Sequence, residues 1–550
     1  MTTTLSDRGR ELGKKTAVGQ ARHLDERLGL SGGVRWLLNY IFPDHWSFMF
    51  GEIALYSFII LIITGIYVSL FYSDSAREII YHGAYVPLRG IHMSEAYAST
   101  INLSFSVRAG LVMRQMHHWA AVLFIGAIGV HMCRVFFTGA FRRPREVNWT
   151  IGLLLLTMAL LNGFFGYSLP DDLLSGTGLR IFYSVFESIP VLGTWAMSWL
   201  FGGQYPGTPD LFARMLVLHM FVVPVAILGL LTAHLIIIMR QHHTQFPGKG
   251  ATETNVVGTP MWPGYAAKSG GYFFMTFAVT AALGGLAQIN PIWLYGPYIP
   301  YQVTTYAQPD WYVGFLEGSL RLMPNFETHL PGHMIANAFW PGVIVPGLLM
   351  TPLFAWPFLE AFFTRDRAHH NLLDRPRDRP VRAAIGAGML TFFFVLLIAG
   401  GDDVLTVFFD TSIQAMVWTL RVILIFGPIL VGGVTYLLCK ELQAVPDAGK
   451  RRRANVIIRT AEGGYAAVPS ETHPSQAGHA ELAPAPVDEA AHEPEPELVM
   501  SGAPGPAAYP STGPSGIPGV AVVQREDPAP TMRPGRGLRR NRRSPRNGAS

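Results

Sequence analysis

Long apolar runs, separated by polar segments, dominate the first 440 or so residues of the chain. Eight runs are long enough to cross the hydrocarbon core of a bilayer as α-helices, which takes roughly 20 residues. The pattern therefore predicts an all-α membrane protein with eight transmembrane helices. A longer polar gap after the fourth run separates an N-terminal four-helix bundle over 48–240 from a C-terminal four-helix membrane domain over 241–440. The runs lie at about 49–71, 115–137, 149–169, 212–239, 271–289, 335–359, 383–400 and 414–438.

Lysine and arginine are distributed unequally among the segments that join the runs. If the N-terminal segment 1–47 lies in the cytoplasm, the segments on that side carry 19 Lys and Arg, and those on the other side carry 5. Cytoplasmic loops are the ones enriched in these residues. The bias predicts that both termini are cytoplasmic and that the long loops 72–114, 170–211 and 290–334 lie at the outer face. Segment 1–47 has no apolar core, so we expect no cleavable signal peptide.

The composition agrees with a membrane protein and limits which residues could hold a redox metal. Half of the 550 residues are apolar or aromatic and 14% are charged, against about 25% in a typical soluble domain. The net charge of +5 comes from basic residues beside the apolar runs, so we expect no nucleic-acid partner. Two cysteines, Cys133 and Cys439, are too few for a disulfide framework, a four-thiolate iron–sulfur site or a zinc ribbon, and there is no C-x-x-C-H motif. The 18 histidines are the remaining candidate ligands.

The last segment, 441–550, differs in character from the rest. It is rich in Pro, Ala and Gly, it is poor in aromatic residues, and its charges fall in blocks such as the basic Lys450–Arg453. Such a composition buries too little apolar surface to offset the entropy of ordering the chain. We therefore expect a disordered cytoplasmic tail, either inert or in contact with anionic lipid or a partner.

Two of the predicted helices each carry a pair of histidines. His117 and His131 are fourteen residues apart in the second helix, and His219 and His234 are fifteen apart in the fourth. At 100° per residue each pair lies on one face, and its members are about 21–22 Å apart along the helix. Both helices run from outside to inside in the predicted topology. His117 is thus expected at the depth of His219, and His131 at the depth of His234.

Paired histidines at two depths predict two b haems held without covalent attachment. An intramembrane histidine is costly and usually functional, and two facing imidazoles fill both axial positions of a haem iron. Such a haem transfers electrons but binds no oxygen. A hydrogen-bonded packing role explains one buried histidine better than it explains four at matched spacing. His118 lies about 140° from the face of His131 and is not expected to be a ligand.

Glycines repeat the histidine spacing. Gly51 and Gly65 in the first predicted helix, and Gly152 and Gly166 in the third, are again fourteen apart. A residue without a side chain lets a helix approach a flat porphyrin closely, although glycine also serves helix packing in membranes. The shared period favours the porphyrin interpretation.

Two arginines flank the histidines. Arg114 precedes His117 by three residues and Arg134 follows His131 by three, which places both on the haem face at opposite ends of the helix. They are candidates to pair with haem propionates. The alternative is that they extend toward the aqueous phase at the helix ends, as long basic side chains often do.

These residues resemble cytochrome b, the membrane subunit of cytochrome bc-type quinol–cytochrome c reductases (complex III). The resemblance covers about 40–440 and rests on the four histidines, the glycine pairs and two motifs. One motif is Gly166–Pro170 (GYSLP), and the other is Pro309–Tyr312 (PDWY), which is similar to the family's Pro-Glu-Trp-Tyr. Gly166–Ser175 (GYSLPDDLLS) and His242–Gly248 (HHTQFPG) are similar to the actinobacterial branch, whose complexes oxidise menaquinol.

The resemblance implies a Q-cycle. Menaquinol is oxidised near the outer face, and one electron passes to a Rieske iron–sulfur subunit and onward to a c-type cytochrome subunit. The other passes through an outer, low-potential haem (His117/His219) and an inner, high-potential haem (His131/His234) to quinone near the inner face. The resemblance also implies a homodimeric complex, a supercomplex with a terminal oxidase, and a multi-pass location in the bacterial plasma membrane.

The outer quinol site is expected where the loop 290–334 meets the end of the third helix. Asp310 is the candidate proton acceptor, since an acid beside aromatic residues in a partly apolar pocket suits that role. The alternative is a turn followed by an interfacial aromatic belt. The other residues that match the family's lining of this site are Pro309, Trp311, Tyr312, Tyr167, Ser175 and Gly178.

The chain departs from the family at several positions. Asp171 and Asp172 stand where a Trp usually follows Pro170, and Glu317 stands where a Tyr is common. At the inner quinone site, the family's histidine and acid fall on Met239 and Ser269. The candidates left for that site are Arg240, His242, His243, Lys268 and Ser269, and the charged ones among them are equally explained as membrane-anchoring groups.

Two other functions compete with this interpretation. A transporter or proton channel with intramembrane histidines predicts polar groups at the bilayer midplane, whereas here they form two layers near the faces. A dihaem membrane anchor of a dehydrogenase needs only four or five helices and leaves the PDWY motif unexplained.

Overall fold

The computed structural model describes residues 19–20, 23, 25–27, 29–302, 308–325, 327–444, 455–459 and 465–469. The chain divides into one unit over Met1–Ser470 and a second over Glu471–Ser550, and the second lies outside the described residues. Every described helix and strand belongs to the first unit.

Eight helical spans in the described part of the chain are long and apolar enough to cross a membrane, as predicted. Several combine an α-helix with a short 3₁₀ or π turn at its start, and the fourth is interrupted by a π turn at Leu218–Val222. The spans are Trp46–Ser69 (containing α3, Met49–Ser69), α5 (Gly110–Phe137), α6 (Glu146–Ser168), Leu211–Gln241 (α9, Leu211–Val217, and α10, Val223–Gln241), Met261–Leu286 (containing α11, Ala266–Leu286), Trp340–Thr364 (containing α14, Val345–Thr364), α15 (Pro380–Ala399) and α17 (Ile413–Ala444).

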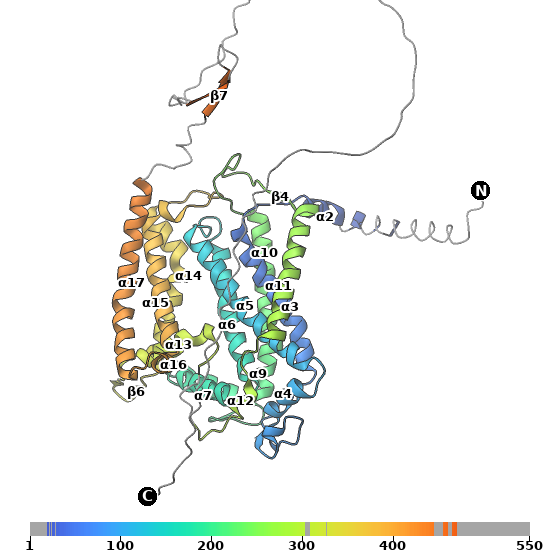
Figure 1. Ribbon diagram of the computed structural model, residues 1–550, viewed down its shortest axis with the longest axis vertical. Coiled ribbons are helices and arrows are strands. Elements are labelled where there is room, and N and C mark those ends of the chain that lie inside the picture. Colours follow the sequence, from blue (N-terminus) through green and yellow to red (C-terminus); the bar gives the residue numbers. More distant parts are fainter. Residues whose placement is uncertain are drawn as a thin grey trace, which may run out of the picture. The chain divides into compact units, whose positions relative to one another are not determined.

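Figure 1 shows these spans side by side, with the shorter helices at the two ends of the bundle. One end carries α2 (Leu30–Leu38) and is called the α2 end; it is the predicted cytoplasmic face. The opposite end carries the other short helices and is called the α13 end. These are α4 (Glu95–Phe105), α7 (Leu173–Glu187), α8 (Leu192–Phe201), α12 (Ile292–Tyr295), α13 (Gly314–Leu322) and α16 (Asp402–Phe408).

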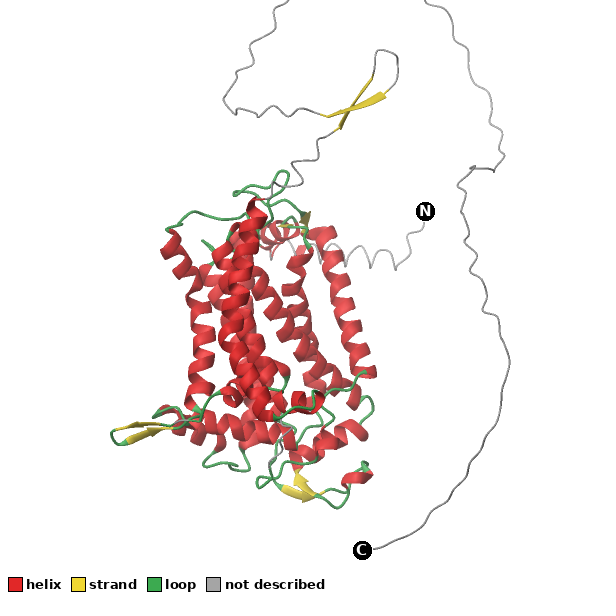
Figure 2. Cartoon of the chain, turned by 60° about the vertical axis from the view of Figure 1, so that its left-hand side comes forward, coloured by secondary structure: helices red, strands yellow, loops and turns green. Residues whose placement is uncertain are grey.

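The described strands lie outside the membrane spans, where they form short antiparallel pairs (Figure 2). None of these pairs extends into a larger sheet among the described residues. The pairs are β1 (Ile41–Phe42) with β4 (Thr259–Pro260), β2 (Glu78–Ile80) with β3 (His92–Ser94), β5 (Thr328–Leu330) with β6 (His333–Ile335), and β7 (Asn455–Arg459) with β8 (Tyr465–Pro469).

Two apolar cores correspond to the two predicted groups of helices. The first lies between α3, α5, α6 and α10, and the second between α13, α14, α15 and α17. Much of the remaining apolar surface faces outward, including Phe363 on α14 and Ile429 on α17, each more than two-thirds exposed. Outward-facing apolar side chains are expected of helices surrounded by lipid. Buried members of the first core include Phe58, Phe124, Ala159 and Ile227, and of the second Phe315, Leu349, Leu396 and Leu420.

The fifth span differs from its predicted grouping. α11 packs against α3 and α5, so it adjoins the N-terminal bundle although its residues fall in the predicted domain 241–440. Gly284 permits this approach, because a Cβ there would lie 2.6 Å from the Met116 side chain. The α5 side chain of Trp119 also donates through Nε1 to the Ala287 carbonyl oxygen at 2.7 Å.

Several helix limits also differ from the apolar runs. The fifth span starts at Met261 rather than near 271, since its first turns contain polar residues that a hydropathy pattern omits. The sixth starts at Trp340 rather than near 335, because Ile335 belongs to β6 and a short turn follows it. In the predicted tail, 441–550, α17 continues to Ala444 and β7 pairs with β8; the rest of that segment lies outside the described residues.

Candidate functional site

The four predicted histidines form two facing pairs inside the N-terminal bundle. The imidazole rings of His117 and His219 have centroids 6.1 Å apart and lie 74° from parallel. His131 and His234 line one cavity of about 670 Å³ near the α2 end. Each pair brings a residue of α5 opposite a residue of the α9–α10 span, as the matched depths predict.

A π turn sets the position of His219. It lies within Leu218–Val222, where the backbone turn is wider than in an α-helix. Pro224 explains the interruption, since it has no amide hydrogen for the carbonyl four residues earlier and its ring clashes with that carbonyl. A π turn absorbs one extra residue, so the fifteen-residue spacing to His234 acts as a fourteen-residue spacing would in a regular helix. The simple angle of 100° per residue misses this adjustment.

Hydrogen bonds orient both rings of the pair nearer the α13 end. His117 Nδ1 lies 3.0 Å from Thr64 Oγ1, and His219 Nδ1 lies 2.9 Å from the Asn162 carbonyl oxygen. The carbonyl can only accept, so His219 donates from Nδ1. This leaves Nε2 unprotonated, which is the form and orientation of an imidazole that ligates a metal.

Each of the four predicted glycines lies against one of the four histidine rings. A Cβ on Gly166 would come within 2.4 Å of the ring it faces, which is closer than non-bonded carbon atoms approach. The other three contacts are looser, from 3.1 to 3.7 Å. The pairs are Gly51 with His131, Gly65 with His117, Gly152 with His234, and Gly166 with His219. The glycines therefore keep open the space into which the rings point.

Both predicted arginines carry buried nitrogen atoms without a hydrogen-bond partner. They are Nη2 of Arg114, and Nε and Nη2 of Arg134. Arg114 Nε donates to Ser104 Oγ at 3.2 Å, and Arg134 stacks over Phe48 with its Cζ 4.1 Å from the ring centroid. A buried guanidinium group is costly unless an anion pairs with it. Facing imidazoles, a glycine cradle and unpaired buried arginines fit two haems with their propionates.

Asp310 is held by two side chains at the α13 end. His118 Nε2 lies 2.8 Å from Asp310 Oδ1, and the Tyr312 hydroxyl donates to Oδ2 at 3.0 Å. His118 is thus a site residue that the sequence pattern did not identify. His118 lies off the haem face of α5 and contacts the 309–312 loop, which is almost 200 residues later in the chain. No local signal reveals the contact.

The rest of the predicted outer site is only partly assembled around Asp310. Tyr167 reaches the same loop, since its hydroxyl donates to the Gln308 carbonyl at 3.4 Å, and Gly178 lies beside its ring. Trp311 is about two-fifths exposed and lies next to Gly126. Ser175 instead pairs with Asp172 in the cap of α7, so a structural role accounts for its hydroxyl.

Of the three acids that depart from the family pattern, Asp172 and Glu317 are buried and Asp171 is partly buried. Burial raises the pKa of Asp171 to about 7, partly offset by the Ser94 hydroxyl, which donates to Oδ2 at 2.6 Å. Burial also raises the pKa of Glu317 to about 7, although Arg321 lies 2.5 Å away and opposes the shift. Asp171 has a backbone φ of 56°, a conformation that Asp and Asn adopt more readily than most residues.

Four of the five residues proposed for the inner quinone site line the 670 Å³ cavity: His242, His243, Lys268 and Ser269. Arg240 is exposed and does not line it. Burial lowers the pKa of His243 to about 4, and its Nδ1 lies 3.3 Å from the Tyr40 hydroxyl. Lys268 is already paired with Asp44 at 2.5 Å.

Comparisons with known proteins agree with this arrangement. A family model described as cytochrome b (N-terminal)/b6/petB matches residues 122–297. The chain is 49% identical over 445 residues to the cytochrome bc1 complex cytochrome b subunit of Streptomyces coelicolor, covering 80% of this chain and 81% of the relative. It is 47% identical over 505 residues to the corresponding subunit of Mycobacterium tuberculosis, covering 91% and 89%. The chain belongs to the family of cytochrome b subunits of bc1 complexes.

A solved structure titled hyperthermophilic respiratory Complex III has the same fold, with a TM-score of 0.55 at 20% identity over 76% of this chain and 99% of that one. Membership of the cytochrome b family confirms the predicted all-α fold with eight membrane spans, implies haem b, and confirms a multi-pass protein of the bacterial plasma membrane. It also decides against the transporter and dehydrogenase-anchor interpretations.

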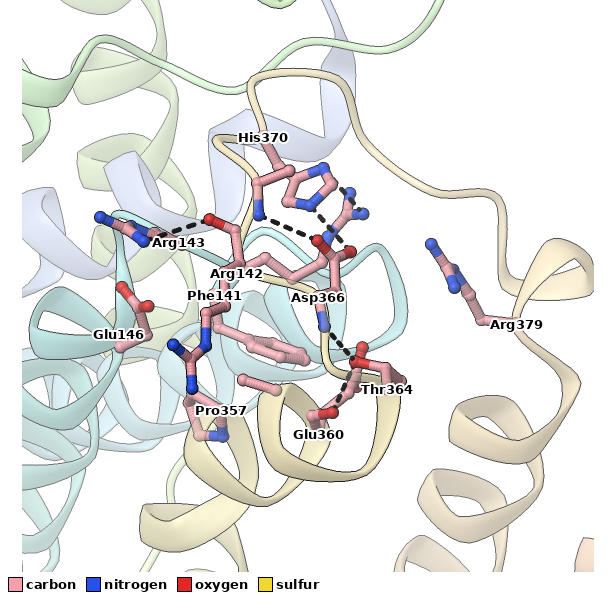
Figure 3. A pocket seen from close by; sticks show the side chains of 13 residues that line it. Phe141, Arg142, Arg143, Glu146, Pro357, Glu360, Thr364, Asp366, His370 and Arg379 are labelled. Carbon is pink, nitrogen blue, oxygen red and sulfur yellow. Dashed lines mark hydrogen bonds and ion pairs between the residues drawn. The ribbon is translucent and has the colours of Figure 1, made fainter.

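This cytochrome b has a second cavity at the α2 end, of about 350 Å³, between the α5–α6 turn and the segment after α14 (Figure 3). His370 stands between two charged partners there. Its Nε2 lies 3.0 Å from Asp366 Oδ2, and its Nδ1 lies 3.3 Å from Arg142 Nη1. The Arg142–His370 contact joins the two helical groups, and none of the predicted site residues lines the cavity.

We predict that Gly166→Ala displaces His219 and removes the haem at that level. The added Cβ would lie 2.4 Å from Cε1 and 3.0 Å from Nδ1 of the ring, so the bond to Asn162 is lost. A pyridine haemochrome assay should show haem content falling by about half. Gly229→Ala in α10 is the matched control, because nothing lies within 4 Å of its added Cβ. Equal haem content in the two variants would contradict the close approach.

We predict that Asp171→Asn removes a pH-dependent loss of stability. The folded chain keeps the Asp171 proton up to about pH 7, whereas the ordinary pKa is 3.8. Folding therefore takes up a proton between these values, so wild-type stability falls as the pH rises, by about 1.4 kcal/mol per pKa unit. Thermal midpoints in detergent should match at low pH and favour the Asn variant above pH 7. A wild-type advantage at high pH would refute the assignment.

Proposed function

We propose that this chain is the dihaem cytochrome b subunit of a menaquinol–cytochrome c reductase. It oxidises quinol near the outer face, the α13 end, and reduces quinone near the inner face, the α2 end. The observation that carries the proposal is the pair of facing histidine levels, with a glycine against every ring. The excess of Lys and Arg in connections at the α2 end supports cytoplasmic termini.

The proposed haem ligands are His117 and His219 in the outer pair and His131 and His234 in the inner pair. When bound at these residues, two haems would supply one-electron transfer across the membrane. The chain's own part is to orient the imidazoles, through Thr64 and Asn162 at the outer level. Arg114 and Arg134 offer buried cationic partners for the propionates.

At the proposed outer site, Asp310 accepts a proton from quinol. His118 and Tyr312 hold one carboxylate oxygen each, and this fixes the direction in which the acid presents its remaining lone pairs. Tyr167 closes the site from the end of α6. The neighbouring Pro309 and Trp311 shape the loop that carries the acid.

Other subunits must supply the remaining redox centres. The chain has no C-x-x-C-H motif for a c-type haem, and its two cysteines, Cys133 in α5 and Cys439 in α17, lie on separate spans. A Rieske cluster needs two cysteines and two histidines together, and the described residues contain no group of three or more His, Cys, Asp or Glu that could hold a metal. We propose a Rieske iron–sulfur subunit and a c-type cytochrome subunit as partners. A homodimeric complex and a supercomplex with a terminal oxidase belong to the same proposal.

We predict that His219→Ala removes only the outer haem. The variant loses one axial ligand at the level nearer the α13 end, while His131 and His234 keep their positions. Reduced-minus-oxidised spectra of the purified complex should show one b haem of the higher potential. The complementary variant, His131→Ala, should leave the lower-potential haem. If each variant lost the other haem, the assignment of the two levels would be inverted.

We predict that Asp310→Asn slows quinol oxidation on the order of 100-fold, the usual contribution of a general base. The amide keeps the size of the side chain and removes its capacity to accept a proton. Both haems should remain visible in the spectrum. Asp210→Asn, the same change at an exposed position of another outer connection, serves as the control. Unchanged turnover in Asp310→Asn would exclude the proton-acceptor role.

A further inference from the structure

A carboxyl group lies at the inner end of the bundle where the sequence pattern does not predict one. The family's acid at the start of the fifth helix falls on Ser269 in this chain. Ser269 Oγ hydrogen-bonds the Tyr56 hydroxyl of α3, and that hydroxyl donates to Glu52 Oε2 at 2.9 Å. The Tyr265 hydroxyl, from the start of the fifth span, donates to Glu52 Oε1 at 2.6 Å. Glu52 therefore faces the missing acid's position from the opposite helix.

Glu52 also lies at the depth of the inner histidine pair. It follows Gly51, whose added Cβ would lie 3.2 Å from the His131 ring. Both Glu52 and His131 line the 670 Å³ cavity, together with Lys268 and Ser269. The cavity thus joins the inner haem level to the first turn of α3 and the first turn of α11.

Only two of the residues lining this cavity are carboxylic acids, Asp44 and Glu52. Asp44 is half exposed and already bonded to two groups, Lys268 at 2.5 Å and the Thr259 hydroxyl at 2.5 Å. A carboxylate paired with a lysine is a weak proton donor, because the cation favours its charged form. Glu52 is held by phenol hydroxyls alone, which can stabilise its charge without cancelling it.

We propose that Glu52 delivers one of the two protons needed to reduce quinone in this cavity. The assignment rests on the proposed function, which brings two electrons to the inner face. Quinone then takes up two electrons and two protons to become quinol. Glu52 gives up its carboxyl proton to one quinone oxygen and becomes a carboxylate bound by Tyr56 and Tyr265. It regains a proton from the inner aqueous phase past the half-exposed Asp44–Lys268 pair. The other quinone oxygen takes its proton from the same phase.

A purely structural role makes a different prediction. In that case Glu52 only ties α3 to the start of the fifth span through Tyr265, and any change that breaks this tie should weaken packing without altering proton transfer. Tyr265→Phe breaks the tie but keeps the carboxyl group. Glu52→Gln removes the acid and keeps the size of the side chain; its amide oxygen accepts from one phenol and its NH₂ group donates to the other. The two substitutions therefore separate packing from proton delivery.

The test uses the complete complex, with dimethylnaphthoquinone as the quinone added at the inner site. In Glu52→Gln, re-oxidation of the inner haem by this quinone should slow on the order of 100-fold. The first reduction of the outer haem by quinol should keep its rate. Redox-difference infrared spectra should lose a carboxyl C=O band that the wild type shows. Tyr265→Phe should keep the band and most of the rate.

Glu146→Gln provides the matched control, because Glu146 lies at the same end of the bundle in the first turn of α6 and does not line this cavity. Glu52→Asp, which retains an acid, covers the possibility that the amide variant fails to assemble; it should restore the band and part of the rate. A carboxyl band that persists in Glu52→Gln, or an unchanged rate of re-oxidation, would overturn the assignment. If the wild type reduced no quinone at the inner face, the proposed function would fail instead.

Discussion

The N-terminal bundle is organised around the need to bring two imidazoles together at each of two depths without closing the space between them. Two helices supply the rings and the two facing helices supply glycines, so every ring points at a backbone rather than at a side chain. Close helix packing in a membrane ordinarily fills such space with small side chains. Here the glycines leave room for the imidazole rings, and the buried arginines at either end supply positive charge.

The need to place both histidines of the fourth span on one face also explains the π turn in that span. Pro224 interrupts the hydrogen bonding of the fourth span, and a π turn follows from it. Because that turn accommodates one additional residue, His219 returns to the face that His234 occupies. The hydrogen bond from its Nδ1 to the Asn162 carbonyl then fixes the ring. The π turn therefore helps to place His219 of the outer pair on the same helix face as His234 of the inner pair.

Much of the fold could be predicted because the hydrocarbon core imposes a simple rule on composition. The eight spans, the two histidine levels and the glycines against them all follow from apolar length and helical period. What could not be predicted depends on contacts between distant segments. The bond between His118 and Asp310 joins residues 192 positions apart, and the packing of α11 on α5 depends on Gly284 meeting Met116. The polar starts of the helices, where Glu52, Lys268 and Ser269 lie, are also the parts that a hydropathy pattern defines least well.

The carboxyl groups at the two ends of the bundle show how one type of residue can suit opposite proton transfers. Asp310 accepts one hydrogen bond from a phenol and lies against an imidazole, which can itself take a proton. Glu52 accepts two bonds from phenols, which do not readily ionise near neutral pH. The first environment provides an onward partner for a proton that has been accepted. The two phenols around Glu52 stabilise the carboxylate that forms when Glu52 gives up its proton. Glu52 then regains a proton from the inner aqueous phase. The direction of proton movement at each face would then be set by what surrounds the carboxyl group rather than by the acid itself.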